Sequence, residues 1–296
     1  MRICVIFNPT ARGDKARNFR RHLDVIGADC AFKQTDCAGA ARRLAAEAIG
    51  EGFETVVAAG GDGTLNEVLN GIGDVPDGFS RIRLGVLPLG TVNVFAKELG
   101  IPTKLEPAWK IMRAGKEARI DVLGVAYTGS SGPTNHYFAQ MAGAGLDARA
   151  VELVNWQLKK KIGPLAYIVA AVKAFLGPLP LITVSGGSQS LSGKQILIGN
   201  GRFYGGKYRV FPEADMQDGH MEVRVFEKIN LLSLIRSTGM FLAGNPLPHS
   251  VAPAFRTNSL VLTSVDKVPF EVDGELIGHL PATISVHPRK LRIITP

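Results

Sequence analysis

Cysteine is scarce in this chain of 296 residues, which contains only Cys4, Cys30 and Cys37. Their number is odd, and their spacings match neither a zinc-binding motif nor a redox motif. This usage argues against a disulfide scaffold and favours buried, reduced thiols in a cytoplasmic protein.

Long apolar segments are absent as well. No stretch approaches ~18 uncharged apolar residues, so the sequence predicts no membrane-spanning helix. The apolar run near the N-terminus, residues 3–7, stops at Asn8-Pro9 and is too short for a signal peptide. We interpret this run as a first β-strand.

Basic clusters typical of nucleic-acid binding are also missing. The formal net charge is +8 at pH 7, which favours anionic partners such as phosphorylated ligands or acidic membrane surfaces. The nearest approach to a basic run, Lys159–Lys161, is short, and no basic residues are interleaved with aromatic ones. We therefore expect no nucleic-acid partner.

The composition is globular, with 46% hydrophobic and 20% charged residues. In the first 120 residues, β-branched runs alternate with segments of helical spacing, which predicts a parallel sheet with crossover helices. Strands are expected at 2–7, 28–35, 54–61 and 82–90, and helices at 14–27, 39–52, 64–72, 92–100 and 102–116.

After residue 120 the pattern changes to short strand-like runs bounded by Gly, Pro, Asn and Asp, which predict an antiparallel, sandwich-like region. Helical segments at about 148–176 and 230–242 interrupt these runs. We predict an α/β domain over 1–120 and a β-rich domain over 121–283, with a C-terminal strand (about 284–296) that can return to the first domain. The runs are 119–127, 136–145, 181–187, 194–201, 221–227, 259–265, 269–275 and 282–295.

Residues 57–72, VVAAGGDGTLNEVLNG, combine an apolar run, a glycine-rich turn and a short amphipathic helix. Free backbone N–H groups and the positive end of the helix dipole make such a turn an anion site. Asp62 would repel a phosphate there, unless a divalent cation lies between them or the carboxylate accepts a proton from the nucleophile. The motif therefore indicates phosphoryl transfer with Mg²⁺.

An alternative without a ligand is a capping box, in which Thr64 caps the helix and Glu67 reaches back. It explains Thr64 and Glu67 but not the flanking glycines. Neither the dinucleotide pattern G-x-G-x-x-G nor the nucleoside-triphosphate loop ending G-K-[ST] occurs in the sequence.

The stretch GGDGTLNEVLNG, residues 60–71, resembles the signature of the diacylglycerol kinase catalytic family, which includes bacterial lipid kinases and sphingosine kinases. Other segments resemble that family in the same order, over residues 3 to about 280. They are NPTARG (8–13), QTDCAGAARRLA (34–45), LPLGTVNVFAKELGIP (87–102), MAGAGLDARAV (141–151), GNGRFYGGKYRVFPEADMQDGHMEV (199–223) and FEVDGE (270–275).

The resemblance implies a kinase that uses ATP and Mg²⁺, with the nucleotide in the cleft between the two domains. It implies that Glu275, with Asp273 beside it, takes the proton from the acceptor hydroxyl, while Asp62 organises Mg²⁺ and the phosphates. ATP would contact Asn8, Pro9, Thr10, Ala11, Arg12, Thr35, Gly61, Asp62, Gly63, Thr64, Leu65, Asn66, Glu67 and Thr91. A second, structural Mg²⁺ site would use Asp218, with Asp215 and His220 supplying mainly backbone carbonyls.

Plain structural alternatives exist for several of these positions. Residues 273–274 form Asp-Gly between two strand-like runs, a strong hairpin signal, and 218–219 are ambiguous in the same way. Residues 143–145, Gly-Ala-Gly, lack the βαβ context of a dinucleotide loop, so we expect close backbone packing there. Val94 departs from the resemblance, because the family usually has Asp at that position.

The acceptor is indicated by residues 155–182, where Lys159–Lys161 precede an apolar run. This arrangement suits a membrane interface with anionic lipid, but equally a core helix with a solvated charged turn. We expect a lipid alcohol such as diacylglycerol as acceptor. The alternatives are a NAD kinase-like phosphotransferase and a non-catalytic nucleotide- or lipid-binding regulator. An exposed sheet edge could pair two copies as a homodimer.

Overall fold

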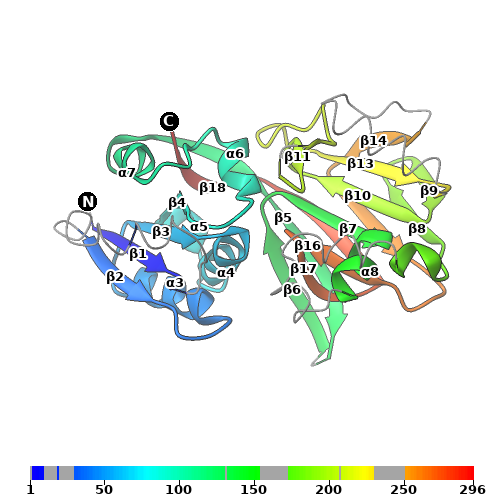
Figure 1. Ribbon diagram of the computed structural model, residues 1–296, viewed down its shortest axis with the longest axis horizontal. Coiled ribbons are helices and arrows are strands. Elements are labelled where there is room, and N and C mark those ends of the chain that lie inside the picture. Colours follow the sequence, from blue (N-terminus) through cyan, green and yellow to red (C-terminus); the bar gives the residue numbers. More distant parts are fainter. Residues whose placement is uncertain are drawn as a thin grey trace.

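The computed structural model describes residues 2–9, 19, 30–130, 132–153, 173–206, 208–229 and 251–296. Figure 1 shows two regions side by side, linked by the long strands β5 (Lys116–Gly129) and β18 (Ala282–Thr295). The functional residues discussed below lie where these regions meet.

The first region is built on four parallel strands in the order β2-β1-β3-β4. Strands β1 and β3 are buried along their whole length, as expected for apolar runs inside a parallel sheet. The bounds are β1 Ile3–Phe7, β2 Cys30–Gln34, β3 Thr55–Gly60, β4 Arg83–Pro88, α3 Ala40–Gly50, α4 Asp62–Gly73, α5 Gly78–Arg81, α6 Val94–Glu98 and α7 Leu105–Ala114.

Strand β18 connects this parallel sheet to the rest of the chain. It pairs antiparallel with β5 and parallel with β4 through Ile293 and Leu84. Its C-terminal half contributes Leu291 and Ile293 to the apolar core of the first region. One ten-stranded sheet therefore runs through both regions.

The second region packs a six-stranded antiparallel sheet, in the order β14-β13-β10-β7-β16-β17, against the other end of the large sheet. Strand β15 alternates exposed and buried residues, the pattern of a strand with one face on a core. The bounds are β6 Gly132–Phe138, β7 Met141–Gly145, α8 Leu146–Glu152, β8 Ile182–Gly186, β9 Gln189–Gly193, β10 Gln195–Gly199, β11 Phe203–Tyr204, β12 Tyr208–Arg209, β13 Met221–Phe226, β14 Ala254–Thr257, β15 Ser259–Thr263, β16 Pro269–Val272 and β17 Glu275–His279.

The predicted fold class is confirmed: a mostly parallel α/β region is followed by an antiparallel, sandwich-like one. The domain division near residue 120 stays a prediction, and β5 runs across that position. The prediction of one strand over 136–145 is wrong, because β6 ends at Phe138 and β7 begins at Met141. Strands β9, β11, β12, β14 and β17 were not predicted.

Some expectations fall on other parts of the chain. The helices predicted at 14–27 (apart from Phe19) and 230–242, and residues 154–172 of the third segment, lie outside the described residues. All three cysteines are reduced thiols, but the expectation that all are buried is wrong, since Cys37 is exposed. Within the described part of the chain, no helix has the length and hydropathy needed to span a membrane.

Candidate functional site

The carboxyl ends of the four parallel strands bring several predicted nucleotide contacts to one edge of the sheet. Asn8 follows β1, Thr35 follows β2, Gly61 follows β3, and Thr91 lies three residues beyond β4. Backbone bonds from Asn8 N to Ala59 O (3.1 Å) and from Thr35 N to Phe7 O (2.9 Å) hold two of these positions. This edge is where open α/β sheets bind ligands.

Helix α4 begins at Asp62, with Gly61 in an extended conformation before it. The capping-box alternative is therefore wrong, because Thr64 lies inside the first turn. Its Oγ1 accepts a hydrogen bond from Asn8 Nδ2 at 3.2 Å. The Glu67 carboxylate instead accepts the N–H groups of Gly39 (2.9 Å) and Ala41 (3.0 Å), which satisfies the start of α3.

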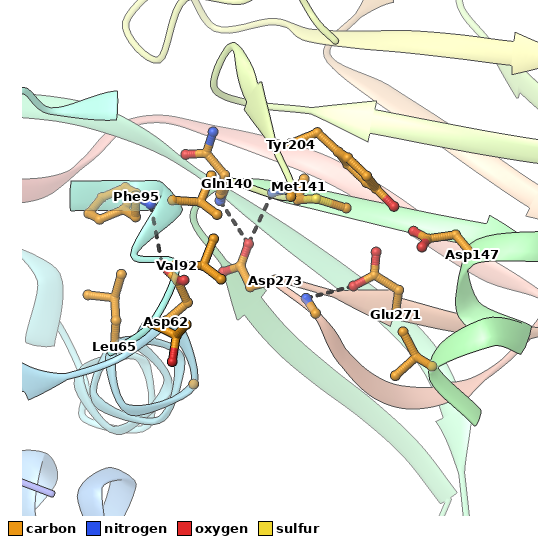
Figure 2. Close-up of a pocket in the computed structure, with 16 residues that line it drawn as sticks. Asp62, Leu65, Val92, Phe95, Gln140, Met141, Asp147, Tyr204, Glu271 and Asp273 are labelled. Atoms are coloured by element: carbon orange, nitrogen blue, oxygen red, sulfur yellow. Dashed lines mark hydrogen bonds between the residues drawn. The ribbon is translucent and has the colours of Figure 1, made fainter. Parts of the chain in front are cut away.

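Asp62 lines a cavity of about 440 Å³ between the two regions. Figure 2 shows its carboxylate beside the start of α6, where Oδ1 accepts the Phe95 N–H at 3.4 Å. Burial raises its pKa, although the backbone N–H groups of residues 93–95 oppose this shift. Gly63, Leu65, Thr91 and Val94 line the same cavity.

Asp273 and Gly274 form the two-residue turn between β16 and β17. Both have a positive φ, 49° for Asp273 and 86° for Gly274. This is the geometry of a tight hairpin, so the plain-turn alternative holds. The side chain nevertheless has partners far from the turn. Its carboxylate accepts the N–H groups of Ala139, Gln140 and Met141 at 3.0 Å each, and Asn66 Nδ2 at 3.2 Å.

These bonds explain why the predicted strand 136–145 is broken. The N–H groups between β6 and β7 turn toward the Asp273 carboxylate instead of continuing a strand ladder. Burial still raises the pKa of Asp273, with the four donors acting in the opposite direction. The carboxylate thus holds the hairpin against both the β6–β7 connection and helix α4.

Helix α4 is fastened to the second region by two asparagines. Asn70 Nδ2 donates a hydrogen bond to the Tyr137 carbonyl oxygen at 2.9 Å, and the Tyr137 N–H donates one to Asn70 Oδ1 at 2.8 Å. Asn66 Oδ1 lies 2.8 Å from His136 Nε2. Burial lowers the pKa of His136 to about 4, so the ring is neutral at pH 7. The side chain of Asn66, predicted to contact ATP, lies in this network.

Glu275 lies at the start of β17, against the glycine-rich turn of the first region. A Cβ atom built on Gly63 would lie 2.6 Å from Glu275 Oε1. Glu275 is exposed to solvent as a residue, but the protein atoms around its carboxyl group displace part of its water and raise its pKa to about 7, with smaller contributions from Glu67 and Asp273. A carboxyl group with this pKa can act as a proton acceptor near neutral pH.

The far wall of the cavity contains Asp147, Glu271 and Tyr204, which the sequence did not single out. Figure 2 shows the three side chains facing one another. A Cβ on Gly143 would lie 2.6 Å from Asp147 Oδ2 and 2.8 Å from Glu271 Oε1. The expected close packing at residue 143 is confirmed, and the packing partners are these carboxyl groups.

A further contact between the regions involves Glu98 at the end of α6. Its carboxylate accepts Arg202 Nε at 2.8 Å, Phe203 N at 3.1 Å and Gln140 Nε2 at 3.1 Å. These bonds fix the short β11–β12 hairpin beside the cavity. Glu98 and Gln140 carry no motif signal that sequence reasoning could have used.

The loop 215–220 is arranged for internal bonding. Asp218 pairs with Arg256 and also accepts the His220 N–H at 2.9 Å, while Asp215 Oδ1 accepts the Gln217 N–H at 3.0 Å. Within the described ranges, no three His, Cys, Asp or Glu side chains form a group that could hold a metal ion. Because the predicted structural Mg²⁺ site relies mainly on backbone carbonyls, these side-chain contacts do not test it, and it stays a prediction.

The remaining predicted contacts cannot be placed. Thr10, Ala11 and Arg12 lie outside the described residues, as do Lys159–Lys161. Pro9 is described and follows Asn8 at the sheet edge.

Comparison with known protein families gives two matches that together cover most of the chain. Residues 2–125 match the diacylglycerol kinase catalytic domain. Residues 140–295 match the YegS C-terminal NAD kinase beta sandwich-like domain.

Individual proteins give the same pattern. The diacylglycerol kinase of Bacillus subtilis (strain 168) is 29% identical over 303 residues, which cover 99% of this chain and 95% of that protein. That of Staphylococcus carnosus (strain TM300) is 28% identical over 307 residues, covering 99% and 94%. A crystal structure of a diacylglycerol kinase from Bacillus anthracis str. Sterne superposes with a TM-score of 0.79 at 20% identity, covering 100% and 97%. At that identity the superposition establishes the fold alone.

Proposed function

This chain belongs to the diacylglycerol kinase catalytic-domain family, and from that membership we infer that it transfers the γ-phosphoryl group of ATP to the hydroxyl of a lipid such as diacylglycerol. The observation that carries this proposal is the position of Glu275. A carboxyl group with a pKa of about 7 from the second region lies against Gly63 in the anion-binding turn of the first.

The phosphates would lie at the start of α4, where backbone N–H groups and the helix dipole favour negative charge. The acceptor would enter the cavity between the regions, whose lining includes Asp273 and Gly274, and its hydroxyl would have to reach the adjacent Glu275 outside that lining. The hydroxyl oxygen attacks the γ-phosphorus, the bond to the β–γ bridging oxygen breaks, and the proton passes to the Glu275 carboxylate. Positioning and charge neutralisation supply most of the acceleration in such transfers.

The Asp62 carboxylate is suited to bind Mg²⁺. It lines the cavity and accepts one long hydrogen bond, and carboxylate oxygens are what Mg²⁺ prefers. Bound Mg²⁺ would neutralise phosphate charge there. Asp273 has a different role: its carboxylate is engaged by four donors, so it holds the turn that carries Glu275.

The acceptor class rests on the family and on the apolar side chains along the cavity, which include Leu65, Val92, Val94, Phe95 and Met141. Contact with an anionic membrane surface is an expectation from residues 155–182, and pairing of two copies is likewise untested. Residues 140–295 match a domain described as NAD kinase beta sandwich-like, so a NAD kinase-like reaction is the alternative.

The test is transfer of label from γ-labelled ATP, with Mg²⁺, to mixed micelles of diacylglycerol and other lipid alcohols, or to NAD⁺. We expect one organic-soluble labelled product, with transfer reduced by Glu275→Gln but not by Glu54→Gln, an exposed carboxyl group in the first region. Label moving to NAD⁺ instead would replace the lipid proposal. Mg²⁺-dependent ATP binding without transfer to any acceptor would favour the other alternative, a non-catalytic nucleotide- or lipid-binding regulator.

A further inference from the structure

Two buried carboxyl groups that the proposed reaction does not use lie side by side on the far wall of the cavity. Glu271, on β16, is 1% exposed, and Asp147 lies on the first turn of α8. Their oxygens Glu271 Oε1 and Asp147 Oδ2 both face Gly143, and no N–H or O–H group of the described residues donates to either oxygen. Because these oxygens lie 2.6 and 2.8 Å from the same point, the position that a Cβ on Gly143 would take, the two carboxyl groups are close neighbours.

Two neighbouring carboxyl oxygens without a donor are a favourable place for a proton. Two ionised carboxylates at this distance repel each other, and burial weakens the hydration that would offset the repulsion. A carboxylic acid facing a carboxylate instead forms a short, charge-assisted O–H···O bond. Burial and the neighbouring acid raise the pKa of Glu271 well above its usual value, and burial raises that of Asp147. The other titratable groups that face the pair are Tyr204 and Asp273.

The outer atoms of the pair connect it to the catalytic turn. Glu271 Oε2 accepts the Gly274 N–H at 2.7 Å, as Figure 2 shows. Asp147 is hydrogen-bonded to the Tyr204 hydroxyl. Gly274 lies between Asp273 and Glu275, so a displaced Glu271 would remove one of the hydrogen bonds that hold the turn and would loosen the placement of Glu275 against Gly63.

We propose that Asp147 and Glu271 share one proton at neutral pH, and that this pair acts as a positioning element for the turn carrying Glu275. The role of Glu275 rests on the proposed kinase function, whereas the shared proton does not. Glutamine can replace a protonated glutamate here, because its oxygen still accepts the Gly274 N–H and its NH₂ donates to the Asp147 carboxylate. Leucine can do neither.

The kinetic test compares Glu271→Gln with Glu271→Leu. Glu271→Gln should keep kcat within about threefold, while Glu271→Leu should lower kcat about tenfold or more with the KM for ATP unchanged, since a displaced base affects the transfer step. A fall in kcat as large for Gln as for Leu would overturn the proposal. A raised KM for the lipid with kcat unchanged in both variants would make the pair an acceptor-binding group instead.

Glu222 provides the matched control. It is also 1% exposed, but it forms a buried ion pair with the Arg224 guanidinium at 2.7 Å. Glu222→Gln should lower the melting temperature, whereas Glu271→Gln should leave it nearly unchanged, because only the first substitution removes a charge that the fold uses.

The proton itself can be observed without any turnover. Infrared spectra of the Glu275→Gln protein, which lacks the carboxyl group with a pKa of about 7, should contain a carboxylic acid C=O band at pH 7. The band should disappear when Glu271→Gln is added and persist when Glu222→Gln is added. Absence of the band would refute the shared proton even if the unsubstituted protein is an active kinase. A band in Glu275→Gln together with no transfer by the unsubstituted protein would keep the pair and refute the kinase proposal.

Discussion

Two Asp-Gly pairs face the same cavity from opposite regions, and they differ in what surrounds the carboxylate. Asp62-Gly63 opens helix α4, and the Asp62 carboxylate accepts one hydrogen bond of 3.4 Å. Asp273-Gly274 forms a hairpin turn, and the Asp273 carboxylate accepts four hydrogen bonds of 3.0–3.2 Å.

The difference separates a group that can bind a ligand from a group that holds the protein together. A carboxylate whose lone pairs are engaged by backbone N–H groups has little capacity left for a metal ion or a substrate proton. The Asp62 carboxylate lies on a cavity wall with one hydrogen bond of 3.4 Å and the backbone N–H groups of residues 93–95 nearby, so it retains more of that capacity. On the proposed function, we therefore expect Asp62 to take part in the chemistry and Asp273 to maintain the geometry that places Glu275.

The largest expected effect follows from removing the Asp62 charge. Asp62→Asn should lower kcat about 10³-fold, because charge neutralisation is a main source of acceleration in phosphoryl transfer. Its free energy of unfolding should change by less than about 1 kcal/mol, the usual size of a charge effect at a helix N-terminus. Steady-state kinetics and urea unfolding of the same preparation measure both quantities. Unchanged kcat would contradict the assignment of Asp62.

Asp273 should behave in the opposite way. Asp273→Ala should reduce the free energy of unfolding by about 3–5 kcal/mol, because it leaves several buried N–H groups without an acceptor. Asp273→Asn should reduce the free energy of unfolding by less, since the amide oxygen still accepts some of these hydrogen bonds. Urea unfolding of the three proteins checks the order. A stable Asp273→Ala protein with kcat lowered as much as in Asp62→Asn would reverse the comparison.

A smaller effect is expected from Gly63→Ala, which places a methyl group 2.6 Å from Glu275 Oε1. The flexible carboxyl group can move aside, so the fold should persist while kcat falls about tenfold. Gly50→Ala is the matched control, because a Cβ there meets no atom within 4 Å. Equal activity of the two alanine variants would mean that transfer does not depend on the position of the Glu275 carboxyl group against residue 63.

The sequence could predict the elements whose signals are local. Alternating apolar runs and helical spacing predicted the parallel sheet, and the GGDG turn directed attention to Asp62. What it could not predict depends on contacts across the chain: the break between β6 and β7 exists because Asp273, more than 130 residues away, accepts the N–H groups there.

The same limit applies to individual site residues. Glu67 matched a local capping box, but it caps α3 through Gly39 and Ala41. Asp147 and Glu271 lie on different elements and meet only over Gly143. Glu98 and Asn70 bond to segments that no short motif connects with them. Pairwise contacts of this kind carry no pattern within a single segment.

The pH dependence of transfer tests the central claim, that Glu275 is the proton acceptor, most directly. Its pKa is raised from 4.5 to about 7, so the carboxylate that accepts a proton predominates only above that pH. We predict that kcat/KM rises with pH up to about 7 and is level above it, and that Glu275→Gln removes this limb and lowers the plateau by about 10²–10⁴-fold. A limb near 7 that persists in Glu275→Gln would contradict the account.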